Sequence, residues 1–175
     1  MRSGALLLFA EIPSTLYLRW FGGIMRTIGI RAGNRGITFA IYDSDNRQVL
    51  NVEEIRIPAA FSTPDGLKYL RSNLLDILRE FEVEKAGIRV TEALAKSVHP
   101  ERIQIEGVVQ EAFASSKLMA YYTGQIATIT TKAGIARDDF KPMVDGEKDP
   151  GVANWKKLAK EEREALLCAM GAVNA

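Results

Sequence analysis

Four glutamates are the residues of this sequence that could most clearly take part in catalysis or bind a metal. Glu161 and Glu164 are three residues apart, a spacing that can place two carboxylates on one face of a helix. Because lysines and an arginine surround them, we favour the interpretation that they belong to a solvated charged surface. Glu92 follows a predicted strand, and Glu106 lies beside the apolar side of a predicted helix. Glu106 could point toward the end of a sheet, although a glutamate in such a position is usually exposed.

Motifs for nucleophilic catalysis and for nucleotide binding are incomplete. His99 is the only histidine, and no serine or cysteine stands in a recognisable nucleophile motif, so no catalytic triad can be assembled. We interpret His99 as a structural residue at the start of a helix, and Cys168, the only cysteine, as a core residue. The turn at 33–36 lacks both the Gly-x-Gly-x-x-Gly fingerprint and the P-loop lysine, so it indicates nucleotide binding only weakly.

Three strands joined by short turns are predicted first. Ile37, Phe39 and Ile41 alternate with other residues at a period of two, which is typical of a strand with two different faces. A strand at 27–32 precedes this one, and a third, from about 48 to 57, follows a turn at 43–46. The domain therefore opens with an antiparallel meander.

A helix and a parallel strand are predicted next. Ser62-Thr63-Pro64-Asp65 combines a hydroxyl N-cap, a proline at the first helical position and an acid in the first turn. A strand at 85–90 follows closely, as in a right-handed crossover unit. The apolar stripe of the helix, which we expect to extend to about Glu82, consists of Leu67, Leu70, Leu74, Ile77, Leu78 and Phe81.

The second half of the chain predicts two more helices and one more strand. A helix opens near His99, a short strand covers 117–122, and a last helix covers 160–173. Segment 125–133 fits either a helix or a strand, and the charged, breaker-rich segment 137–153 predicts a loop or flap. We therefore expect an α/β domain with a five-stranded mixed sheet, the second strand antiparallel to the others, and helices on both faces.

Residues 1–24 do not continue this pattern. The apolar run at 5–10 ends at Glu11 and Pro13, so it is too short for a signal peptide or a membrane span. A second apolar patch, 16–24, contains Trp20 and Phe21. We interpret 1–24 as an extension outside the core and 25–175 as a single domain. An amphipathic helix that docks on a partner or a membrane surface is the alternative.

The composition is that of a globular protein. Of the 175 residues, 47% are hydrophobic and 26% are charged, enough for one domain with a sizeable core. The 23 basic and 22 acidic residues nearly cancel, which leaves only a local patch for binding nucleic acid. A single cysteine excludes a disulfide framework and favours a reducing cytoplasm, and no membrane partner is expected.

The order of these elements resembles the ribonuclease H-like fold, and short motifs resemble its RuvC-type Holliday-junction resolvase branch. Ile28-Gly29-Ile30-Arg31-Ala32-Gly33 is similar to the opening strand of that branch, which normally reads Ile-Gly-Ile-Asp-Pro-Gly. Segment 86–89 is similar to its fourth strand, which normally ends in glutamate, and 161–165 to the Asp-x-x-Asp-Ala signature of its last helix. Segment 105–110 is also similar to a small bacterial family with this fold. The likeness covers roughly 26–173.

Two arginines depart from that pattern. In active members, carboxylates on the first strand, the fourth strand and the last helix hold two divalent metals that activate water. Here the two strand positions are Arg31 and Arg89, and a guanidinium has no lone pair with which to coordinate a metal. One interpretation is that each arginine pairs with a nearby acid, so that salt bridges replace the metal cross-links; the candidate acids are Glu92, Glu106, Glu161 and Glu164. The other is that the two guanidiniums bind a phosphate or carboxylate.

The resemblance therefore implies a non-catalytic module without a cofactor, in which Arg31 and Arg89 bind an anion. Its partner would be nucleic acid, a nucleotide or another protein chain, including a second copy. The alternative is a divergent metal-dependent nuclease that uses Mg²⁺ or Mn²⁺ with Glu92, Glu106, Glu161 and Glu164. A fragment of a sugar or acyl-group kinase is a third hypothesis, which the short length disfavours.

Overall fold

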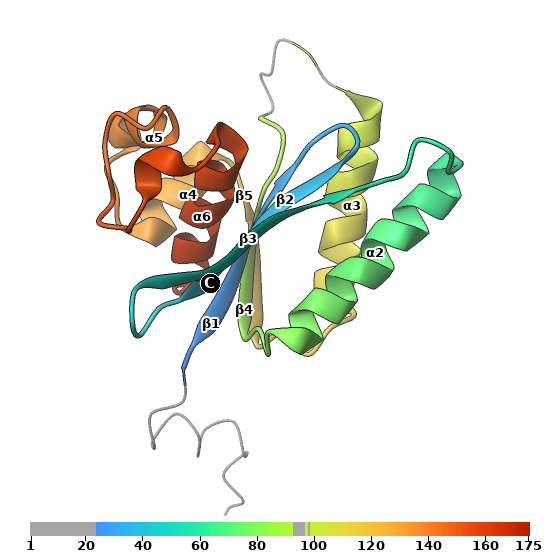
Figure 1. Ribbon diagram of the computed structural model, residues 1–175, viewed down its shortest axis with the longest axis horizontal. Helices are drawn as coiled ribbons and strands as arrows, with labels where there is room; N and C mark the ends of the chain where they lie inside the picture. Colours follow the sequence, from blue (N-terminus) through green and yellow to red (C-terminus); the bar gives the residue numbers. More distant parts are fainter. Residues whose placement is uncertain (1–23, 93–96, 98) are drawn as a thin grey trace, which may run out of the picture.

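The computed structural model describes residues 24–92, 97 and 99–175, and these form one mixed sheet with helices on both faces (Figure 1). The sheet order is β3-β2-β1-β4-β5. β2 is antiparallel to β1 and β3, whereas β4 is parallel to β1 and β5. The predicted five-stranded sheet with one reversed strand is confirmed. The strands are β1 (Arg26–Ala32), β2 (Gly36–Asp43), β3 (Gln48–Arg56), β4 (Lys85–Arg89) and β5 (Ala120–Gly124).

Two helices, α2 (Thr63–Glu80) and α3 (Pro100–Ala114), cover one face of the sheet (Figure 1). The Ser62 side chain caps α2 by accepting a hydrogen bond from the Asp65 N–H, as the sequence predicts. The predicted stripe faces the core: Leu70, Leu74 and Leu78 are buried, while Leu67, Ile77 and Phe81 are partly buried against the same cluster. α2 ends two residues before the predicted Glu82.

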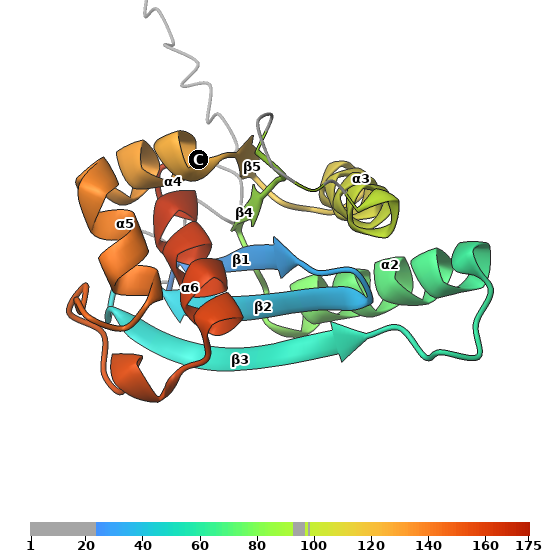
Figure 2. The ribbon, with the colours of Figure 1, turned by 90° about the horizontal axis from the view of Figure 1, so that it is seen from above.

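Among the described residues, three helices cover the other face: α4 (Ile126–Ala133), α5 (Arg137–Val144) and α6 (Lys160–Ala172). Figure 2 shows α4 and α5 following one another beside α6. The ambiguous segment 125–133 is thus helical. Its threonines fit the helix because the hydroxyls of Thr130 and Thr131 donate to the Ala127 carbonyl at 3.0 and 2.9 Å. A single-turn 3-10 helix, η1 (Trp155–Lys157), precedes α6.

The prediction of a loop or flap over 137–153 is wrong in its first half, where α5 lies. Phe140, Met143 and Val144 are buried in the same cluster as α6, and burial of these side chains stabilises a helix that its charged residues and Pro142 obscure in the sequence. Asp138 and Asp139 in the first turn also suit the positive end of the helix dipole.

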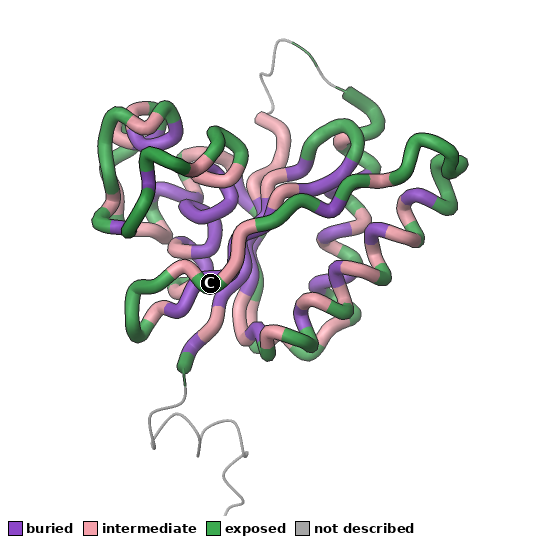
Figure 3. The backbone as a smooth tube through the Cα atoms, in the orientation of Figure 1, coloured by how far each residue is buried: buried purple, intermediate pink, exposed green. Residues whose placement is uncertain are grey.

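Helix α6 lies directly against β1. A Cβ added at Gly29 would lie 1.9 Å from the Ala165 carbonyl oxygen, so only glycine permits this approach. The Thr27 hydroxyl donates to the Ala169 carbonyl at 2.7 Å and fixes the helix along the strand. Six consecutive residues of α6, from Glu164 to Ala169, are buried, and Figure 3 shows buried positions along the sheet and this helix. Cys168 is among them, as expected.

The N-terminal extension that we expect at 1–24 lies outside the described residues except for Ile24, so the domain boundary stays a prediction. Within the described part of the chain, no helix is long and apolar enough to cross a membrane.

Candidate functional site

Arg31 on β1 and Arg89 on β4 lie side by side because the two parallel strands pair them in register. Both form ion pairs with the same oxygen, Oε2 of Glu164: Arg31 through Nε, and Arg89 through Nη1 at 2.5 Å. The three side chains are largely buried: the exposed fraction is 17% for Arg31, 14% for Arg89 and 7% for Glu164. The arginines therefore converge at one end of the sheet, and one carboxylate neutralises part of their charge.

The interpretation of Glu161 and Glu164 as a solvated surface pair is wrong for Glu164. Glu164 is buried against the sheet, whereas Glu161 is exposed at the start of the helix. Two guanidiniums offset the cost of desolvating the Glu164 carboxylate, and both come from strands distant in the chain. The neighbouring sequence, rich in lysine and arginine, carries no sign of that pairing.

Glu106 on α3 is also buried, contrary to the expectation that it would be exposed. Its carboxylate accepts three hydrogen bonds: from Arg102 Nε at 2.9 Å, from the Thr91 N–H at 3.1 Å and from the Thr91 hydroxyl at 2.8 Å. These donors compensate for its desolvation and fasten α3 to the residues that follow β4. Burial lowers the pKa of the Arg102 guanidinium, and the positive charges of Arg31 and Arg89 lower it further. Arg102 is therefore close enough to both arginines to feel their charge.

The four candidate carboxylates do not form a metal site. Glu92 accepts a hydrogen bond from the Ile126 N–H at 3.0 Å at the start of α4, while Glu106, Glu161 and Glu164 occupy the different environments described above. In the ranges 24–92 and 99–175, no group of three or more histidine, cysteine, aspartate or glutamate side chains is arranged to hold a metal. Two metals need several anionic oxygens facing one position, and here Glu164 already faces two permanent cations. The donor set does not fit the metal pair of the active nucleases.

An open cavity of about 590 Å³ adjoins the arginine cluster, by which we mean Arg31, Arg89 and their shared partner Glu164. Arg31 lines it together with Arg35, Arg56 and Arg102, and the tip of the β1–β2 hairpin forms part of its wall. Arg35 is exposed and forms no ion pair within the described residues. Arg89 is not among the lining residues; its guanidinium lies over the Phe140 ring, 5.5 Å from the centroid. Four glutamates also line this cavity: Glu53, Glu54, Glu161 and Glu162.

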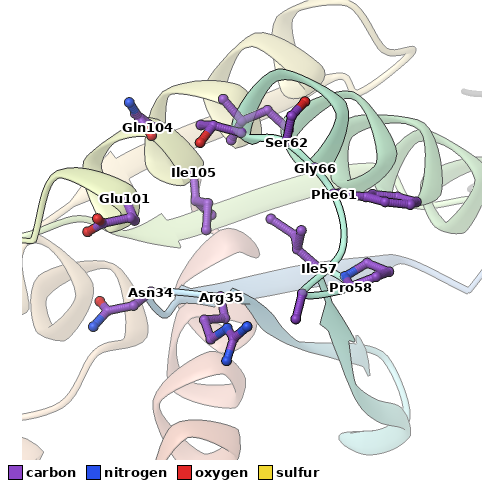
Figure 4. A pocket seen from close by; sticks show the side chains of 13 residues that line it. Asn34, Arg35, Ile57, Pro58, Phe61, Ser62, Gly66, Glu101, Gln104 and Ile105 are labelled. Carbon is purple, nitrogen blue, oxygen red and sulfur yellow. The ribbon is translucent and has the colours of Figure 1, made fainter.

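A smaller cavity of about 220 Å³ lies on the other side of the hairpin tip. Figure 4 shows Asn34 and Arg35 on one side of it, and Glu101 and Gln104 of α3 on the other. Asn34 and Arg35 therefore border both cavities. In the sequence, the turn at 33–36 stands out only through its glycines, and nothing indicates that Arg35 and Arg102 line the same cavity. The one local signal is the four-residue spacing of Arg102 and Glu106, which allows an ion pair along a helix.

Cys168 and His99 add no nucleophilic chemistry. Burial raises the pKa of the Cys168 thiol to about 12, so the reactive thiolate is suppressed. His99 is exposed at the N-cap position of α3, and its side chain makes no capping hydrogen bond.

Comparison with known proteins identifies the fold. No family model and no curated protein sequence matches this chain. The structure of Thermus thermophilus RuvC is similar, with a TM-score of 0.63 and 14% identity over 84% of this chain and 92% of that chain. The same organism's RuvC in complex with a Holliday junction substrate gives a TM-score of 0.65 and 15% identity over 84% and 91%. The RuvC-type, ribonuclease H-like fold predicted from the sequence is confirmed; at this identity the likeness concerns the fold alone.

Proposed function

We propose that this chain is a non-catalytic module of the RuvC-type fold that binds the phosphate backbone of nucleic acid along the cavity wall formed by Arg31, Arg35 and Arg102. The observation that carries the proposal is the buried Arg31–Glu164–Arg89 bridge. It occupies the positions that, by the motif resemblance, hold metal-binding carboxylates in the active nucleases. The similar RuvC structure that holds a Holliday junction substrate supports nucleic acid over a free nucleotide as the ligand.

The charge of the bridge supports binding of an anion rather than a metal. Two guanidiniums and one carboxylate leave a formal charge of +1, from +2 and −1. At an effective dielectric of about 20, two unit charges about 4 Å apart interact by about 4 kcal/mol. Repulsion on that scale disfavours a divalent cation beside the two arginines, and the same field attracts a phosphate.

The accessible donors define where a phosphate would bind. Arg31 and Arg89 are occupied by Glu164, so the first contact falls to Arg35 at the exposed hairpin tip, with Arg31 and Arg102 behind it. A planar guanidinium can bind a phosphate through two parallel hydrogen bonds. The four glutamates that line the same cavity would repel a phosphate placed near them. The nucleic-acid backbone would therefore stay beside Arg31, Arg35 and Arg102. Because the chain as a whole is nearly neutral, we expect weak binding that is sensitive to salt.

Binding to labelled single-stranded, duplex and four-way-junction DNA, measured by fluorescence anisotropy at several salt concentrations, tests the proposal. Arg35→Ala should weaken binding and reduce the slope of log K against log salt by about 0.7–0.9, the effect of losing one phosphate contact. Arg79→Ala removes the same charge from an exposed position on α2 and is the matched control. Equal effects of the two substitutions would contradict the assigned surface.

Incubation of the same DNAs with Mg²⁺ or Mn²⁺ tests the absence of catalysis. We expect no cleavage products from the wild-type protein. Metal-dependent cleavage that disappears in Glu92→Gln would refute the non-catalytic assignment and support the divergent nuclease. The same loss in Glu164→Gln counts only if circular dichroism shows that this variant is folded.

A further inference from the structure

An apolar groove lies at the end of the sheet opposite the arginine cluster, the lower end in Figure 1. It has a volume of about 640 Å³ and runs between the C-terminal half of α2 and the connection from α3 to β5. Leu75 and Leu78 line it on the α2 side, and Leu118 and Met119 on the other. Met119 is 49% exposed. The volume of the groove falls in the range of about 300–1,000 Å³ that is typical of ligand-binding sites.

The N-terminal segment joins the domain beside this groove. Arg26, the first residue of β1, donates from Nη1 to the Phe81 carbonyl at 3.1 Å and pairs with Glu82 at 3.0 Å. Its own carbonyl accepts from the Glu84 N–H at 2.9 Å, and the Glu84 carbonyl accepts from the Met119 N–H at 2.8 Å. Two inter-strand steps of about 4.8 Å each therefore separate Arg26 from Met119, a distance of about 10 Å.

The residues just before β1 have the sequence that such a groove would accept. Leu16, Trp20 and Ile24 are spaced four residues apart, and Phe21 follows Trp20. Apolar residues at three- and four-residue spacing are the anchors with which an amphipathic helix binds a hydrophobic groove. Trp20 precedes Arg26 by six residues, which span about 9 Å as a helix and about 20 Å when extended. Either conformation brings the indole within reach of Met119.

We propose that segment 16–24 docks in this groove of its own chain, with Trp20 and Phe21 as the anchors, and covers Met119. The covalent connection favours this occupant over a second copy, because a short linker holds the segment at an effective concentration in the millimolar range. The segment thereby belongs to the surface of the domain rather than to its core, and its removal uncovers the groove.

Limited trypsin digestion of the full chain, followed by intact mass spectrometry, tests this proposal at Arg19, which lies within the segment. We expect slow cleavage after Arg19 in the wild-type protein and at least about tenfold faster cleavage in Met119→Glu, because a buried carboxylate would expel the anchors. Trp20→Ala, which leaves the groove untouched, should accelerate cleavage similarly. Leu50→Glu introduces the same charge at an apolar position that is 40% exposed on β3, outside the groove, and should cleave like the wild type.

Trp20 fluorescence provides an independent measurement, taken as the difference between the wild type and Trp20→Phe. A docked indole should emit at shorter wavelength and resist acrylamide quenching, and Met119→Glu should abolish both effects. Cleavage at the same rate in the wild type, Met119→Glu and Trp20→Ala would overturn the proposal. Protection that increases with protein concentration would also overturn it, since a second copy would then occupy the groove.

Discussion

Replacing Glu164 by glutamine should destabilise the protein strongly. The substitution keeps the size of the side chain but removes the only charge that the described structure pairs with Arg31 and Arg89, whose side chains are 17% and 14% exposed. Removing one partner of a buried ion pair typically costs about 3–5 kcal/mol. The loss comes from the attraction of the Glu164 carboxylate to the two guanidiniums, because two opposite unit charges about 4 Å apart interact by about 4 kcal/mol at an effective dielectric of about 20. We therefore expect a loss of about 3–5 kcal/mol in the free energy of unfolding.

Urea denaturation followed by circular dichroism measures this loss, with an unchanged m-value as the sign that the native state keeps its compactness. Glu161→Gln removes the same charge from an exposed position on the same helix and should change stability by no more than about 0.5 kcal/mol. The triple variant Arg31→Met/Arg89→Met/Glu164→Leu, which removes every charge of the cluster, should recover most of the loss.

A loss below about 1 kcal/mol in Glu164→Gln would refute the reasoning, because it would mean that the two guanidiniums reach solvent or another acid when the carboxylate is gone. Failure of the triple variant to recover stability, with Glu164→Gln strongly destabilised, would show that shape rather than charge makes Glu164 necessary.

Three further predictions concern the folded domain. Leu74→Ala should cost about 2–5 kcal/mol in urea denaturation because Leu74 is fully buried in the core beneath α2; a loss below about 1 kcal/mol would contradict that packing. Hydrogen bonds from Arg71 and Ser115 lower the pKa of the Glu111 carboxyl to about 2 from an ordinary value of 4.5, so its contribution to stability is present above pH 4.5 and is lost as the pH falls toward 2. Thermal melts of Glu111→Gln should accordingly depend less on pH in that window than those of the wild type, and an identical dependence would argue against the Arg71 contact. A chain that begins at Met25 should still unfold in one cooperative transition, as seen by calorimetry, and a protein without a transition would place residues 1–24 in the core.

Local patterns were sufficient to predict most of the architecture. The alternation in β2 and the cap and apolar stripe of α2 identify these elements, because a strand and an amphipathic helix each bury one face at a fixed period. The order of elements then leaves few ways to connect them, since crossover connections are right-handed. α5 escaped prediction because its stability comes from burying Phe140, Met143 and Val144 against other elements, while its own sequence is rich in charge and contains a proline.

The site depended on tertiary structure. The sequence placed Arg31 and Arg89 at the positions of lost carboxylates but left their partner open among four glutamates. The register of β1 with β4 and the contact of α6 with Gly29 bring Glu164 to both guanidiniums, and the same folding places Arg35 and Arg102 along one cavity. Charge pairing depends on distance and burial in three dimensions. Neither distance nor burial can be derived from the spacing of residues along a chain. The sequence therefore did not distinguish Glu164, which is buried, from Glu161, which is exposed three residues earlier.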